Sequence, residues 1–269
     1  LPLPSTVVLP MRQAAGAPAT PAVEVGEEVS IGTVIGEPAE TVGVPILATI
    51  SGKVTAIEER PGPEGRDELC VVIDGDGEET WLAEPAEEGD WRILRPHEML
   101  ERIRRAGVIT SGFGAEPSHR DLGTAIEARG HVGVSGAPVM RSVEHLIVRA
   151  VDVDPAIHTL ETVLRNHVAE AQVGFEVIKH ILGASAVHLV LSRGEGSGLN
   201  EKTIEQLCDP LEIWPVQAQP WQYPSVNDEM LISSIAGIEV GGAFSEPRDM
   251  GVIVENIDTV IDVGRAVLT

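Results

Sequence analysis

The spacing of apolar residues changes near residue 90, and this change constrains the fold more than any other feature. Residues 1–85 contain short β-branched runs broken by glycines, as in PAVEVGEEVSIGTVIGEP and GVPILATISGKVTAIEER. Several short strands at close spacing are typical of a small barrel or sandwich. The stretch EPAEEGDW is an acidic, proline-containing connector. We therefore place a domain boundary there, between residues 1–90 and 91–269.

After the connector, runs that favour strands alternate with runs that favour helices. RPHEMLERIRRAGV has helical spacing and should end at Gly107; the runs HLIVRAV, AVHLVLS, LEIWPVQ and DMGVIVE read as strands. Residues 160–183 are expected to form one helix ending at Gly183, and Asn256 is expected to cap the last helix. This alternation predicts an α/β domain with a mostly parallel sheet covered by helices. Ligands of such sheets bind at the carboxyl ends of the strands.

Composition argues against several classes of function. The chain has 42 acidic and 19 basic residues, a net charge of −23, and the acids are spread along it. Such a surface repels nucleic-acid phosphates and anionic lipids, so we expect no nucleic-acid partner. An iron–sulfur cluster usually takes four cysteines, whereas Cys70 and Cys208 stand alone, so we expect no cluster in this chain.

The sequence also lacks membrane and secretion signals. No apolar run is long enough to span a bilayer, so we expect no direct membrane insertion. The opening LPLPSTVVLP has no basic flank of the kind found in signal peptides. We therefore expect a cytoplasmic chain.

Three loops carry residues that could bind a ligand. RAGVITSGFGAEPSHRDL at 105–122 could bring backbone N–H groups to an anion, or it is a turn. VDVDP puts Asp152 and Asp154 near a strand end, where both could face one site and bind a ribose hydroxyl, a metal or a proton. Alternatively, Asp154 only helps to turn the chain. SRGEGSGLNEKT at 192–203 lacks phosphate-loop spacing and reads as a flexible loop. The histidines show no metal-ligand spacing, so no metal site is expected.

The pattern VGEEVSIGTVIGE…VPILATISGKVTAIEE resembles the biotinyl/lipoyl-type barrel-sandwich module. Carrier modules of that kind bear their cofactor on a lysine at a hairpin tip. The corresponding stretch here, residues 36–45, contains no lysine. We therefore expect a structural module without covalently bound biotin or lipoate.

The motifs, taken in order over nearly the whole chain, resemble the C subunit of the Rnf electron-transport complex. Related proteins are the A subunit of sodium-translocating NADH:quinone oxidoreductase and the flavin- and NADH-binding subunit of respiratory complex I. The resemblance implies a barrel-sandwich hybrid domain followed by a Rossmann-like α/β domain. It also implies a subunit of an electron-transfer complex, held at the inner membrane through its partner subunits. If the chain is itself active, it would be an NADH dehydrogenase-like oxidoreductase.

The resemblance further implies which residues would contact FMN or NADH. The family segments AGIVGxGGAGFPTHVK, NGAECEP, YPQGGEKQL and QNVGTA correspond to AGVITSGFGAEPSHRD, RAVDVDP, YPSVNDEML and ENIDTV. The implied cofactor-binding residues are Gly107, Gly112, Gly114, Pro117, His119, Asp152, Asp154 and Asn256. We also expect Asp152 and Asp154 to lie in one cleft with residues 110–119.

Departures from the family pattern predict a weakened flavin site. Phe113 and Glu116 crowd the glycine-rich loop, and Asp121 stands where the family has a lysine. The segment YPSVNDEML lacks both glycines and the lysine of its counterpart. An acid in place of a base removes a favourable charge for an anionic ligand, so we expect FMN to bind weakly or not at all. Two alternatives remain open: a working NADH/FMN oxidoreductase subunit and a non-catalytic docking scaffold of a redox complex.

Overall fold

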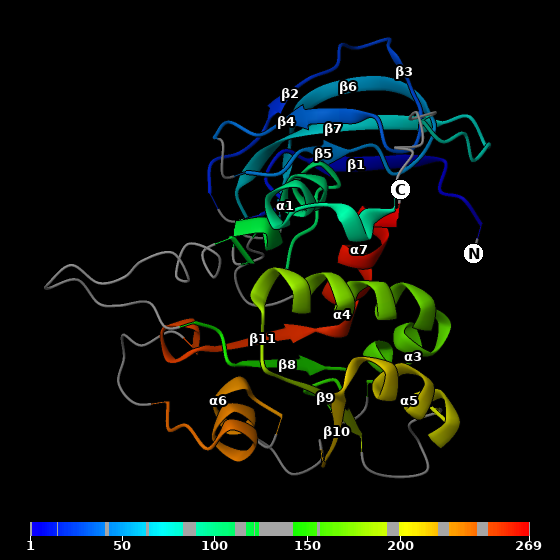
Figure 1. Cartoon of the computed structure of the whole chain (residues 1–269). Helices are drawn as coiled ribbons and strands as arrows, with labels where there is room; N and C mark the ends of the chain where they lie inside the picture. Colours follow the sequence, from blue (N-terminus) through cyan, green and yellow to red (C-terminus); the bar gives the residue numbers. More distant parts are fainter. Residues whose placement is uncertain are drawn as a thin grey trace, which may run out of the picture.

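The protein has an N-terminal β domain and a C-terminal α/β domain, drawn above and below each other in Figure 1. This architecture confirms the predicted fold class, whereas the boundary at residue 90 stays a prediction. The computed structural model describes residues 2–14, 16–40, 43–62, 65–82, 90–110, 117–120, 122–123, 142–154, 157–192, 199–219, 226–240 and 247–268.

Two antiparallel sheets form the β domain. The first has the order β1-β7-β6-β3, with strands Thr6–Pro10, Asp67–Gly75, Gly52–Pro61 and Glu28–Val29. The second has the order β2-β4-β5, with strands Thr20–Pro21, Val34–Glu37 and Ile46–Leu47. Ile35, Val54 and Ile73 are fully buried within one apolar cluster of this domain. Short strands suffice here because the sheets bury one shared core.

The α/β domain contains a parallel sheet with the order β10-β9-β8-β11. Its strands are Ile213–Ala218, Ala186–Ser192, His145–Arg149 and Val252–Asn256. From β8 the chain adds β9 and β10 on one side, and it later adds β11 on the other side of β8. The strand order therefore reverses between β8 and β11, and this is the topological switch point of the sheet.

Helices cover both faces of this sheet (Figure 1). Those of one face are α1 (Pro96–Arg105), α3 (Thr159–Asn166), α4 (Val168–Leu182), α5 (Glu201–Cys208) and α7 (Ile257–Leu268). The other face packs against α6 (Asp228–Leu231) and the π-helical turn Ile232–Ala236. Short 3₁₀ turns occur at Trp91–Ile93, Asp209–Leu211 and Pro247–Met250. The central strands are apolar because both of their faces are covered.

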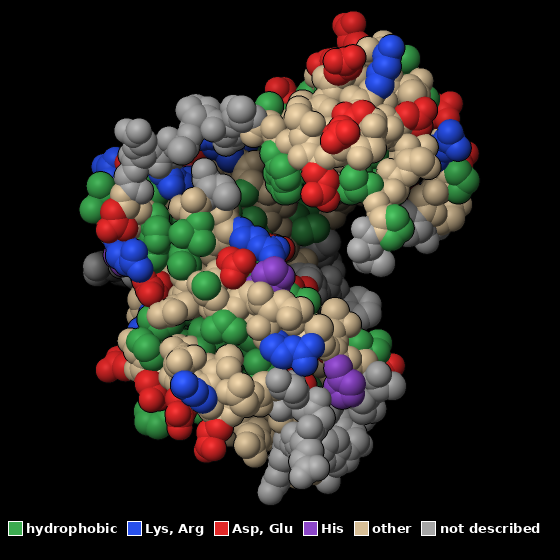
Figure 2. All heavy atoms as spheres, turned by 90° about the vertical axis from the view of Figure 1, so that its right-hand side faces the viewer, with side chains coloured by type: hydrophobic (Ala, Val, Ile, Leu, Met, Phe, Trp, Pro, Cys, Tyr) green, Lys and Arg blue, Asp and Glu red, His purple; other side chains and the backbone are tan. Residues whose placement is uncertain are grey.

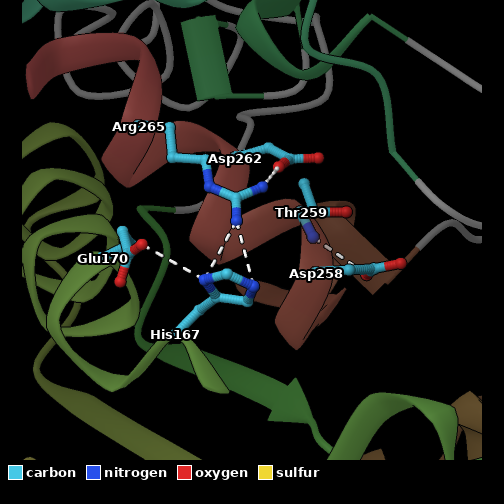
Figure 3. A network of polar contacts seen from close by, with 6 residues as sticks. All are labelled: His167, Glu170, Asp258, Thr259, Asp262 and Arg265. Atoms are coloured by element: carbon cyan, nitrogen blue, oxygen red, sulfur yellow. Dashed lines mark hydrogen bonds and ion pairs between the residues drawn. The ribbon is translucent and has the colours of Figure 1, made fainter. Parts of the chain in front are cut away.

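The single helix predicted over 160–183 is wrong in one respect, because it is two helices. The backbone at His167 leaves the helical region, with φ −134° and ψ 41°, and α4 begins at the next residue. His167 Nδ1 lies 3.1 Å from Glu170 Oε1 and 3.0 Å from Arg265 Nη2, which joins the break to α7 (Figure 3). The C-terminal end is as predicted, since Gly183 adopts a left-handed conformation with φ 58°.

The acidic side chains are distributed over both domains. Figure 2 shows them scattered across the visible face, with no single acidic patch.

Both cysteines are buried, and burial raises the pKa of Cys208 to about 11 and also raises the pKa of Cys70. These thiols therefore stay protonated at neutral pH and belong to the apolar interior.

Candidate functional site

The switch point between β8 and β11 is the position where an open α/β sheet most commonly binds a ligand. Arg149 ends β8 and Asn256 ends β11, and the two residues are register partners in the parallel ladder. Arg149 Nε donates a hydrogen bond to Asn256 Oδ1 at 2.9 Å. A side chain of the protein itself therefore joins the two strand ends at the switch point.

The same guanidinium reaches the segment that leads into α6. Arg149 Nη1 donates to the main-chain oxygen of Val226 at 3.1 Å and pairs with Asp228 Oδ1 at 2.9 Å. The Arg149 side chain is 14% exposed, compared with 51% for Asp228. Arg149 was not among the residues expected at the site. The available signal was one arginine inside the mostly apolar run HLIVRAV.

Asp152 has a structural partner on α3. Its Oδ2 accepts a hydrogen bond from the backbone N–H of Leu160 at 3.1 Å. The residue at the N-cap position, His158, makes no side-chain capping bond. Asp152 therefore supplies an acceptor for one of the N–H groups that a helix start leaves open.

Asp152 and Asp154 do not lie on a strand, so strand alternation does not bring them to one face, and their sharing of one site stays a prediction. Strand β8 ends at Arg149, so the alternation of a strand no longer applies at these two positions. Asp154 is exposed, and its main-chain oxygen accepts from Ile157 N at 3.0 Å. This hydrogen bond agrees with the alternative in which Asp154 helps the chain to change direction.

Gly107 marks a close approach between the two domains. It has φ 71°, and a Cβ added there would lie 3.1 Å from the main-chain oxygen of Pro45 in the β domain. The left-handed conformation and this contact both favour glycine without any cofactor. Gly112 and Gly114 lie outside the described residues.

The base of the loop after Gly107 is closed by backbone contacts. Ile109 and Pro117 form an isolated antiparallel bridge, and Ser118 N donates to Val108 O at 3.1 Å. His119 is half-buried, and its Nδ1 has no hydrogen-bond partner among the described residues. Burial and the positive charge of Arg104 lower the pKa of His119, which favours a neutral ring. The predicted cleft shared by residues 110–119 and the two aspartates stays a prediction, since residues 111–116 lie outside the described parts.

Glu161 is a buried carboxylate that was not expected from the sequence. It is 2% exposed, and its Oε1 accepts from Ser192 N, at the end of β9, at 2.9 Å. Its Oε2 has no partner among the described residues. Burial raises the pKa of Glu161, and the charge of Asp152 adds to the rise. The sequence does not indicate that Glu161 is buried, because a glutamate in a helix is usually exposed.

The raised pKa of Glu161 predicts how Glu161→Gln changes the pH dependence of stability. The folded protein holds this proton to a higher pH than the unfolded chain, so folding binds protons and wild-type stability falls as pH rises through that interval. Glutamine takes up no proton over this range. We expect the difference in unfolding free energy, variant minus wild type, to increase from pH 4 to pH 7, as measured by urea unfolding.

Glu98→Gln provides a control with the opposite sign. Hydrogen bonding to Arg95 lowers the pKa of Glu98 to about 2, so this carboxylate contributes stability above its unfolded pKa. Its variant should lose stability relative to wild type over the same rise in pH, by a small amount because the pair is exposed. A flat difference for Glu161→Gln would contradict the burial argument.

A surface pocket of about 500 Å³ lies along β9, β10 and α5 rather than at the switch point. Ser192, Glu205 and Gln217 contribute polar groups to it, and leucine, isoleucine and proline side chains line much of the remainder.

Within the described ranges, no three His, Cys, Asp or Glu side chains are grouped to hold a metal ion. Among the helices that the structure describes, none is long and apolar enough to cross a membrane.

Comparison with known proteins identifies the class of both domains. The model of the Nuo51 FMN-binding domain matches residues 103–265, and that of the RnfC barrel sandwich hybrid domain matches residues 1–78. The chain therefore belongs to the Nuo51 FMN-binding family, with a barrel-sandwich hybrid domain preceding its α/β domain.

Curated relatives of this chain include C subunits of Rnf-type complexes. One is the C subunit of the ion-translocating oxidoreductase complex of Vibrio cholerae, 28% identical over 99% of this chain and 32% of the relative. Another is the C subunit of the proton-translocating ferredoxin:NAD(+) oxidoreductase complex of Clostridium ljungdahlii, 29% identical over 99% of this chain and 54% of the relative. The chain thus spans about a third to a half of these relatives.

A solved structure, the NAD+-reducing NiFe hydrogenase in its H2-reduced state, aligns with a TM-score of 0.48 and 18% identity over 69% of this chain and 33% of the hydrogenase chain. The matches with family models and curated relatives confirm the resemblance to the Rnf C subunit. They do not support the resemblance to the A subunit of sodium-translocating NADH:quinone oxidoreductase.

Proposed function

We propose that the chain serves as part of a C subunit in an Rnf-type electron-transport complex and that it binds FMN weakly or not at all. The observation that carries the first part is the order of the domains. Both family models match in the order expected for this subunit, and the curated relatives align with 99% of the chain. Its partners would be the other subunits, which would also hold it at the membrane.

The described residues at the switch point do not fit the FMN that the family implies. Asn256, the implied flavin contact, accepts a hydrogen bond from Arg149, and the carboxylate of Asp228 lies beside the same guanidinium. Asp152 adds a carboxylate shortly after the end of β8. Each unfavourable charge near the FMN phosphate costs about 1 kcal/mol or more. Two such charges would weaken the affinity at least about thirtyfold.

An FMN titration tests the second part of the proposal. We expect no saturable quenching of FMN fluorescence at micromolar protein and moderate salt, and a colourless protein after purification. A dissociation constant below about 1 μM, which corresponds to roughly −8 kcal/mol, would contradict weak binding. It would favour the alternative of a working NADH/FMN oxidoreductase, to which the match with an FMN-binding family lends support.

Co-expression with the remaining subunits tests the first part. We expect the tagged chain to co-purify with the other subunits of an Rnf-type complex, because 99% of its sequence aligns with the C-subunit relatives. The β domain alone is co-expressed in the same way as a control. It shows which part of the chain contacts the other subunits. Failure of the whole chain to associate with any subunit would contradict the proposal. Association without flavin would support the docking-scaffold alternative for this part of the protein.

A further inference from the structure

We infer that the guanidinium of Arg149 takes the place of a bound cofactor at the switch point of the sheet. It fastens the ends of β8 and β11 to the start of α6, so that this edge is held in its folded arrangement without a flavin. The inference rests on the proposed function, which it deepens by naming the group that occupies the cofactor position.

The three partners of Arg149 lie far from it in the chain. Val226 and Asp228 lie 77 and 79 residues from Arg149, and Asn256 lies 107 residues away. Each of the segments that meet here includes a stretch that the family resemblance implicates in cofactor binding. A single side chain therefore makes the long-range connections that a ligand at the switch point would otherwise make.

The chemistry of the cluster suits a cation. The groups that converge on Arg149 are an amide oxygen, a main-chain oxygen and a carboxylate, and all three are acceptors. An acceptor cluster is complementary to a cation that donates in a fork, such as guanidinium. It is not complementary to a phosphate or to any other anion, which needs donors.

Burial makes these contacts necessary. Arg149 is 14% exposed, and a charge removed from water to this extent is stable only when it is paired and hydrogen-bonded. Asp228 supplies the opposite charge, and the two oxygens of Val226 and Asn256 accept further N–H groups. Removing the guanidinium removes the N–H groups that join these three acceptors to one another, which loosens the segments that carry them.

Arg149→Ala is the test, with Arg104→Ala as the matched control. Arg104 forms two hydrogen bonds to the carboxylate of Glu101, but both residues lie on α1 and their contact is local. Hydrogen–deuterium exchange is measured by mass spectrometry on the purified chain. In Arg149→Ala we expect exchange at least tenfold faster in peptides covering 145–150, 226–232 and 252–257. Peptides from residues 2–82 should be unchanged, and Arg104→Ala should leave all of these peptides unchanged.

Two further measurements keep the inference testable if the alanine variant folds poorly. Arg149→Lys retains the charge but not the fork, so its exchange should lie between those of wild type and Arg149→Ala. Millimolar methylguanidinium should slow exchange at the same peptides of Arg149→Ala, because it refills an acceptor-lined site. FMN at the same concentration should not slow exchange at these peptides. Greater protection of this variant by FMN than by methylguanidinium would overturn the assignment of a cation position.

The outcomes separate this inference from the proposed function. If FMN protects these peptides in the wild-type chain, weak flavin binding is wrong and Arg149 does not replace the cofactor. If FMN does not change hydrogen exchange in the wild-type chain, and Arg149→Ala shows the same exchange rates as Arg104→Ala, only the inference about Arg149 fails. Failure to associate with the other subunits would bear on the proposed function and leave the role of Arg149 intact.

Discussion

Replacing Gly174 with alanine is expected to destabilise the α/β domain by roughly 2 kcal/mol or more, because the contact is overpacked. Gly174 is buried in α4, and a Cβ added there would lie 1.9 Å from the main-chain oxygen of Val260 in α7. Alanine is favoured over glycine inside a helix by about 1 kcal/mol. The clash outweighs this gain, because the obstructing atom is backbone and one whole helix must shift. Urea unfolding at neutral pH measures the change.

Gly264 offers the same test from the opposite helix, and Gly123 offers a control. A Cβ at Gly264 would lie 2.0 Å from the main-chain oxygen of Glu170, so Gly264→Ala should show a similar loss. A Cβ at Gly123 would meet only Leu100 Cδ1 at 3.6 Å, an ordinary contact, and Gly123→Ala should change stability little. Wild-type stability in Gly174→Ala would show that α4 and α7 can separate without cost.

The contact between α4 and α7 also bears on the switch point. Helix α7 starts directly after Asn256, so a shift of α7 moves the residue that accepts from Arg149. We therefore expect Gly174→Ala to increase hydrogen exchange in residues 252–257 in addition to lowering global stability. The two close-packed glycines thus position one of the acceptors of the Arg149 cluster.

Sequence patterns predict the elements of this fold well where the signal is local. The run AVHLVLS is strand β9, and Gly183 ends α4, because strand propensity and left-handed glycine act over a few residues. The break at His167 gives no such signal. Apolar spacing continues across it, while the break itself accompanies contacts with Glu170 and the distant Arg265 (Figure 3).

The site was harder to predict than the fold, because its contacts are distant in sequence. The sequence indicates Asn256 as a cofactor contact, which stays a prediction, but it does not indicate the partner Arg149, because that pairing depends on which strands become neighbours. The motif VDVDP indicates a ligand-binding acid at Asp152, and the structure shows that the carboxylate of Asp152 makes a hydrogen bond with the start of α3. A short motif can indicate that an acid follows a strand, but it cannot indicate which backbone N–H that acid meets.

Replacing Gly52 with alanine is expected to loosen the β domain while the α/β domain keeps its stability. Gly52 begins β6 with φ 153°, and a Cβ there would lie 2.1 Å from the main-chain oxygen of Asp74 in β7. Because β6 is the central partner of β7 and β3, the clash separates strands on which the first sheet depends. We expect a loss of roughly 2–3 kcal/mol, at the upper part of the range for overpacking. Hydrogen exchange by mass spectrometry locates it.

The control and the distribution of the effect decide whether residues 1–90 behave as a separate domain. Gly26 also has a positive φ, 98°, but a Cβ there meets only Lys53 Cε at 3.9 Å, so Gly26→Ala isolates backbone strain from the clash. Its loss should be about 1 kcal/mol, the lower end for a strained conformation. In Gly52→Ala, faster exchange should be confined to residues 2–82. If hydrogen exchange in β8 and α7 became faster by the same factor, the two parts would unfold together. The contact between Gly107 and Pro45 would then couple the two domains more strongly than the predicted boundary allows.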